Sequence, residues 1–93
     1  MELDLQEIRK SLDAIDDQMV ELFSRRMRLV KDVAAYKKEH GLPVLDAGRE
    51  EKILDRVSEK AGESLAPYVR RVYETMFAVS REYQAEQWKD GDK

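Results

Sequence analysis

The chain has 93 residues, 40% of them charged and 8% aromatic, which suits one small domain of helices rather than a β-sandwich. Its net charge of −3, without a basic run, excludes the electrostatic footprint of a nucleic-acid-binding protein. The absence of cysteine excludes disulfides and thiolate sites, and a single histidine, His40, excludes a histidine metal cluster and a Ser-His-Asp triad. No apolar stretch approaches the roughly 20 residues of a membrane span and no signal peptide follows Met1, so we expect a cytoplasmic protein without a membrane partner.

A long first helix is predicted over residues 4–39. Asp4 is a suitable N-cap, and Gly41 and Pro43 stop the helix at its other end. Its apolar residues alternate in steps of three and four, as in a heptad seam: Leu5, Ile8, Leu12, Ile15, Met19 and Leu22. Such a rod is about 50 Å long, whereas a compact chain of this size is about 30 Å across. We therefore expect a second chain to cover the seam, most simply in a two-fold homodimer.

Two shorter helices are predicted after the first. Asp46 reads as the N-cap of a helix over residues 47–61, which Gly62 ends. A third helix is predicted over residues 65–88, again with apolar residues in steps of four and three, followed by a frayed tail over residues 89–93. The sequence thus predicts a single all-α domain over residues 1–93.

Polar residues stand on the helix faces that otherwise pack. Arg26 occupies a seam position, and Lys37 shares its face eleven residues later. Glu50 shares a face with the apolar residues of the second helix, and Ser80 and Gln84 replace the apolar stripe of the third. For any one of these residues, snorkelling or a structural ion pair with Glu50 is the better interpretation.

Taken together, the same residues favour a pocket for a small ligand with several negative charges. Several buried charges are costly unless something compensates them, and the cations outnumber the carboxylates. Arg9 lies 17 residues before Arg26, about 25 Å along the rod, so it can join such a pocket only from the partner chain of an antiparallel dimer. Five other arginines are interpreted as solvent-facing: Arg25, Arg28, Arg70, Arg71 and Arg81. Trp88 is interpreted as a packing residue.

This arrangement resembles the all-helical (AroQ-type) chorismate mutases over nearly the whole chain, from Leu5 to about Gln87. The resemblance rests on eight positions that match in order and spacing: Arg9, Arg26, Lys37, Asp46, Arg49, Glu50, Ser80 and Gln84. It implies an intertwined homodimer of three-helix chains in the shikimate pathway of aromatic amino acid biosynthesis. It also implies the conversion of chorismate to prephenate, an intramolecular rearrangement that needs no cofactor and no metal.

The resemblance further implies a role for each matched residue. Arg26 and Arg9 of the partner subunit would bind the substrate carboxylates, with Ser80 nearby. Lys37 and Gln84 would face the ether oxygen of the breaking bond, where negative charge develops. Glu50 and the region of Asp46 would hold the ring hydroxyl, and Arg49 would support the site electrostatically. The apolar walls would be Val30, Val33, Ile53 and Phe77.

Two other functions stay open. An isochorismate-pyruvate lyase would share the fold and a similar anionic substrate, although the segment from Asp46 to Glu50 is more typical of a mutase. A non-catalytic helical dimer, acting as a regulatory or dimerisation module, would tolerate the loss of Arg26 and Lys37. The chain could also belong to a fusion with another shikimate-pathway enzyme.

Overall fold

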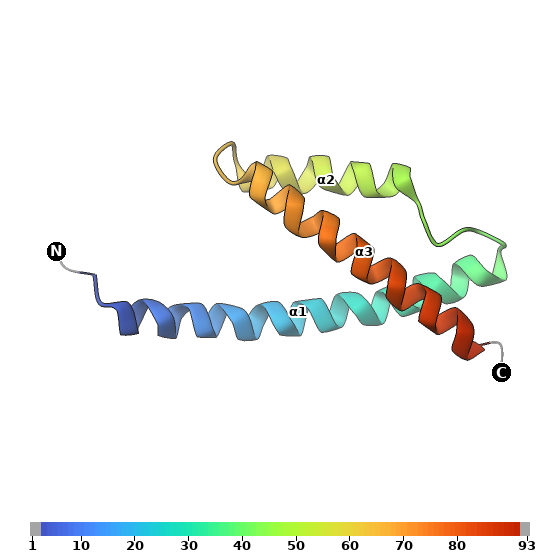
Figure 1. Ribbon diagram of the computed structural model, residues 1–93, viewed down its shortest axis with the longest axis horizontal. Helices are drawn as coiled ribbons and strands as arrows, with labels where there is room; N and C mark the ends of the chain where they lie inside the picture. Colours follow the sequence, from blue (N-terminus) through green and yellow to red (C-terminus); the bar gives the residue numbers. More distant parts are fainter. Residues whose placement is uncertain (1–2, 92–93) are drawn as a thin grey trace.

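Three helices make up the computed structural model, which describes residues 3–91 and the side chains of residues 3–89 (Figure 1). They are α1 (Leu5–Glu39), α2 (Ala47–Ala61) and α3 (Ala66–Gly91), and the described residues form no strand. The chain folds back after α1, and α3 crosses diagonally between the other two helices and contacts both. The all-α prediction is confirmed.

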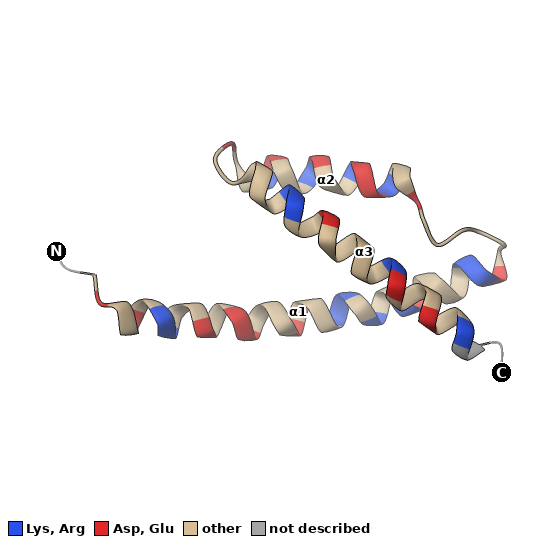
Figure 2. Cartoon of the chain, viewed as in Figure 1, with Lys and Arg blue, Asp and Glu red and all other residues tan. Residues whose placement is uncertain are grey.

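Charged residues recur along every helix (Figure 2). No helix between residues 3 and 91 is long and apolar enough to cross a membrane.

The ends of α1 are determined by local hydrogen bonds. The Asp4 carboxylate accepts from the amides two and three residues further on, at 2.9 and 3.4 Å, which makes it the predicted N-cap. At the other end the Leu42 amide donates to the carbonyl of Lys37 at 2.8 Å, and the Gly41 amide to that of Lys38 at 3.4 Å. Gly41 has a φ of +66°, a conformation that glycine adopts without strain. α1 therefore begins one residue after its cap and ends at the predicted residue.

The first half of α1 extends beyond the rest of the chain. The molecule measures 59 × 29 × 14 Å with a radius of gyration of 17.0 Å, against about 12 Å for a compact domain of this length. The seam residues Leu5, Ile8, Leu12, Ile15, Met19 and Leu22 are 39–58% exposed. The single chain therefore leaves the apolar seam of α1 exposed.

The hydrophobic core lies between α2 and α3. Its buried members are Ile53, Leu54, Val57 and Phe77, with Val69 and Tyr73 packed against them. The rings of Tyr73 and Phe77 meet edge to face, with centroids 6.0 Å apart. This small core aligns α2 with α3, and so positions their polar residues relative to α1.

The prediction for the C-terminal end was wrong in part. α3 begins at residue 66 rather than 65 and continues to Gly91, so residues 89–91 are helical and not frayed, while residues 92 and 93 lie outside the described part. Contacts with α1 explain the extension. The Trp88 indole donates to the carbonyl of Ala34 at 2.7 Å, and Lys38 Nζ donates to the carbonyl of Trp88 at 3.0 Å. These two bonds hold the last turns of α3 against α1.

The Trp88 contact leads to a prediction about stability. Trp88→Phe removes the indole N–H but keeps an aromatic ring, and should lower the free energy of unfolding by about 1 kcal/mol. Urea denaturation followed by circular dichroism, at one fixed protein concentration, would measure the change. Tyr68→Phe, at an exposed tyrosine, is the control and should leave the midpoint unchanged. A Trp88→Phe midpoint equal to that of the control would show that the bond does not stabilise the fold.

Candidate functional site

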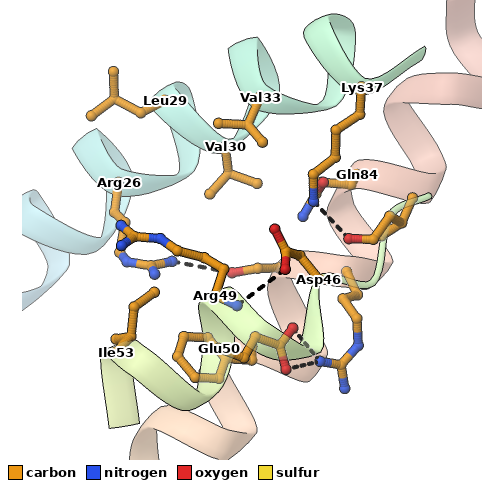
Figure 3. Close-up of a pocket in the computed structure, with 14 residues that line it drawn as sticks. Arg26, Leu29, Val30, Val33, Lys37, Asp46, Arg49, Glu50, Ile53 and Gln84 are labelled. Carbon is orange, nitrogen blue, oxygen red and sulfur yellow. Dashed lines mark hydrogen bonds and ion pairs between the residues drawn. The ribbon is translucent and has the colours of Figure 1, made fainter. Parts of the chain in front are cut away.

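A cavity of about 280 Å³ is lined by side chains of all three helices (Figure 3). Seven of the eight predicted site residues line it, and so do all four predicted wall residues. The lining side chains come from all three helices and from the connector between α1 and α2: Arg26, Leu29, Val30, Val33, Lys37, Val44, Asp46, Arg49, Glu50, Ile53, Phe77, Ser80, Arg81 and Gln84.

Helical spacing explains how α1 and α3 present these groups. Arg26, Val30, Val33 and Lys37 follow one another in steps of four, three and four, so they lie on one face of α1. On α3, steps of three and four carry the lining from the core residue Phe77 through Ser80 to Gln84. Both faces turn toward the cavity, which is the arrangement that their spacing predicts.

Arg26 is held in the cavity without a carboxylate partner. One of its terminal nitrogens donates to the Ser80 hydroxyl at 3.4 Å, and its guanidinium carbon lies 5.9 Å from the centre of the Phe77 ring. Ser80 is only 5% exposed, and its hydroxyl is also 3.8 Å from the sulfur of Met27. Among the described residues, no carboxylate lies within ion-pair distance of Arg26. Its charge is therefore available to a ligand.

Lys37 and Gln84 present polar groups at another part of the cavity wall. Lys37 Nζ donates to the carbonyl of Val44 at 2.7 Å, which directs the ammonium without neutralising it. Gln84 is 6% exposed, and its side-chain oxygen has no hydrogen-bond partner in the described part of the chain. Since a buried acceptor without a partner is costly, a ligand that donates a hydrogen bond to this oxygen would bind more tightly.

Glu50 forms an ion pair with Arg81. The sequence predicted neither this partner for Glu50 nor a position for Arg81 at the cavity. One terminal nitrogen of Arg81 lies 2.6 and 2.7 Å from the two carboxylate oxygens, and both side chains are partly buried. The structural ion pair of Glu50 with Arg26 or Lys37 does not form, and the solvent-facing assignment of Arg81 was wrong. Arg81 lies four residues after Phe77 and three before Gln84, so its helical position pointed toward the cavity.

Asp46 has a structural role at the cavity edge. As predicted, its carboxylate caps α2 by accepting from the Arg49 amide at 3.0 Å. Asp46→Ala should therefore destabilise the chain by about 1 kcal/mol, whereas Asp46→Asn, which keeps an accepting oxygen, should cost only a few tenths. Thermal denaturation of the two variants at equal concentration tests this. Equal melting temperatures for Asp46→Ala and Asp46→Asn would mean that the capping hydrogen bond does not stabilise α2.

Arg9 does not line the cavity of its own chain. It stands near the start of α1, 17 residues and about 25 Å before Arg26. Its part in the site stays a prediction that depends on a second chain.

The charges of the cavity favour a small dianion. Four cationic side chains, Arg26, Lys37, Arg49 and Arg81, face two carboxylates, Asp46 and Glu50, which leaves a net charge of +2. Valine, leucine, isoleucine and phenylalanine side chains complete the lining and keep water away from part of the site. In such surroundings fixed donors act on a bound anion more strongly than they would in water.

A family model described as chorismate mutase type II matches residues 8–85. The chorismate mutase of Methanocaldococcus jannaschii is 45% identical over 53 residues, which cover 57% of this chain and 54% of that protein. The 4-amino-4-deoxychorismate mutase of Streptomyces venezuelae is 35% identical over 60 residues, which cover 64% of this chain and 58% of that protein.

A solved structure extends this similarity to the fold. A conserved hypothetical protein from Pyrococcus furiosus matches with a TM-score of 0.73 at 31% identity, over 90% of this chain and 99% of that one. By contrast, the chain spans little more than half the length of the two curated relatives.

Proposed function

The chain belongs to the chorismate mutase type II family, and from this premise we propose that it catalyses the rearrangement of chorismate to prephenate. The observation that supports the proposal is the presence of Arg26 and Lys37 in one cavity, both without a carboxylate partner among residues 3–89. Chorismate is a dicarboxylate with a ring hydroxyl and an ether oxygen. Its charge of −2 therefore complements the net positive charge of the side chains that line the cavity.

The proposed binding mode assigns each part of the substrate to the lining group that complements it. Arg26 binds one carboxylate, with the Ser80 hydroxyl beside it, because a guanidinium can bond both oxygens of a carboxylate. The ring hydroxyl donates to Glu50, and Arg49 adds positive charge at the rim. Holding the flexible dicarboxylate in one compact conformer supplies part of the rate enhancement by orientation alone.

Lys37 and Gln84 would act on the reaction itself. As the C–O bond breaks, negative charge grows on the ether oxygen, and donors aimed at that oxygen stabilise the transition state more than the bound substrate. In this proposal the Lys37 ammonium and the Gln84 amide N–H are those donors. The reaction is intramolecular, so the chain needs no nucleophile and no general base.

The proposed assembly is a homodimer in which each site receives Arg9 of the partner subunit. It is supported by the exposed seam on the first half of α1, since an exposed apolar surface of this length marks an interaction face. Two antiparallel copies of α1 would cover each other's seams. The same arrangement would bring Arg9 of one chain to the cavity of the other.

A second candidate substrate is 4-amino-4-deoxychorismate, which the name of the Streptomyces relative contains. It carries an amino group where chorismate has the ring hydroxyl. The pairing of Glu50 with Arg81 favours chorismate, because the carboxylate facing that group is already neutralised.

The direct test follows the loss of chorismate absorbance on adding the purified chain, with identification of the product as prephenate. Arg26→Gln should bind chorismate more weakly, while the exposed Lys31→Ala should behave like the original chain. Release of pyruvate from isochorismate, without turnover of chorismate, would instead identify a lyase. No product from either substrate, and no rise in melting temperature with chorismate, would identify a non-catalytic dimer.

A further inference from the structure

The Glu50–Arg81 pair is the only cross-helix ion pair among the residues that line the cavity, within the described part of the chain. Glu50 projects from the first turn of α2 and Arg81 from the middle of α3. The contacts of 2.6 and 2.7 Å from a single nitrogen use both carboxylate oxygens at once. Figure 3 shows the Glu50 carboxylate beside the cavity, which Arg81 also lines.

Three of the four other charged groups of the lining have partners of their own, and no ion pair among the described residues joins the fourth, Arg49, to Glu50. Arg26 bonds Ser80, Lys37 bonds a backbone carbonyl, and the carboxylate of Asp46 caps α2. Glu50 is thus the carboxylate of the cavity that is held in an ion pair, and Arg81 is the cation that accompanies it.

The ion pair with Arg81 changes which kind of hydrogen-bond donor on a ligand Glu50 binds most strongly. A carboxylate has about four acceptor positions on its two oxygens, so Arg81 leaves room for another hydrogen bond. A neutral hydroxyl can donate to the remaining acceptor position of Glu50 without being repelled by the charge of Arg81. A protonated amino group in the same place gains little from a carboxylate that is already neutralised, and it meets the guanidinium as a like charge.

We propose that Arg81 is a specificity-determining residue: by neutralising Glu50, it makes the site select a substrate with a ring hydroxyl over one with an amino group. The proposal rests on the proposed function, since it requires that the substrate hydroxyl faces Glu50. Arg81 acts through Glu50, and so it is a positioning residue rather than a catalytic one.

The test compares two substrates that differ in this one group, chorismate and 4-amino-4-deoxychorismate. Equal concentrations of both are given to the dimeric protein, and the ratio of the two rearranged products yields the ratio of their kcat/KM values. Arg81→Gln, which removes the charge but keeps a hydrogen-bonding side chain, should shift that ratio toward the amino compound at least about tenfold. Arg81→Lys keeps a cation beside Glu50 and should retain most of the original preference.

Arg70 offers a matched control on the same helix. It lies eleven residues before Arg81, about three helical turns, and also links α3 to α2 through a contact of 2.9 Å with Glu51. It does not line the cavity. Arg70→Gln therefore removes a comparable link between the two helices and should leave the substrate ratio unchanged.

A second variant keeps the proposal testable if Arg81→Gln does not fold. Glu50→Gln leaves Arg81 as an unpaired cation, so it should shift the ratio in the opposite direction, toward chorismate. An equal loss of activity on both substrates in Arg81→Gln, with the ratio unchanged, would show that Arg81 only joins the helices and would overturn the proposal. If the original chain rearranges neither compound, the proposed function itself fails. Turnover of chorismate with a ratio insensitive to Arg81 refutes only the specificity role.

Discussion

Replacing Lys37 by alanine is expected to lower the turnover of chorismate at least about 100-fold, while the chain stays folded. The side chain lies at the cavity wall, and its ammonium bonds a backbone carbonyl at 2.7 Å rather than a carboxylate. In the proposed mechanism, its full charge therefore remains available to the ether oxygen as that atom becomes negative. Because this interaction strengthens in the transition state, its loss should reduce kcat more than it raises KM.

Steady-state kinetics of chorismate loss would measure the effect, and circular dichroism would confirm the helical content. Lys31→Ala removes an exposed lysine of the same helix, and should change neither constant. Lys37→Arg keeps a positive charge on a bulkier, planar group, and should recover only part of the turnover. If folded Lys37→Ala turned over chorismate at nearly the original rate, the assignment of Lys37 to the ether oxygen would be wrong.

Mixing two inactive variants, Arg9→Ala and Arg26→Ala, is expected to restore activity. In the proposed dimer each site combines Arg26 of one chain with Arg9 of the other. Either homodimer then lacks one arginine at both sites, and each should lose about 100-fold or more in kcat/KM. A mixed dimer has one site that lacks both arginines and one that is complete.

After unfolding and refolding together in equal amounts, half of the dimers should be mixed. The mixture should then show about a quarter of the original activity, because each mixed dimer has one complete site out of two. Each variant refolded alone is the control and should stay inactive. If the mixture were no more active than its components, while size-exclusion chromatography showed dimers, Arg9 would not belong to the partner's site.

The sequence was a good guide to the elements and to the faces of the helices. Asp4, Gly41 and Asp46 act within one turn of the chain, so the ends that they determine could be read from neighbouring residues alone. The steps of three and four that place Arg26 with Lys37, and Ser80 with Gln84, are also local, because they follow from the helical repeat.

The errors concern groups whose partners come from another helix. Trp88 extends α3 because its indole reaches the carbonyl of Ala34, 54 residues earlier, and no pattern around residue 88 shows that contact. Arg81 had a helical position beside the cavity, yet its neighbours in sequence offered no reason to prefer Glu50 to solvent.

Local patterns in the sequence are therefore enough to predict the three helices, the apolar seam of α1 and the polar face of each helix. These depend on spacing and capping, which act over three or four residues. Which charged groups pair with one another depends instead on how the helices pack, and no local pattern shows it. Glu50 and Arg81, 31 positions apart in the sequence, are brought together because core packing sets the rotation of α2 against α3. Within the described residues, the same rotation leaves Arg26 and Lys37 without a carboxylate partner.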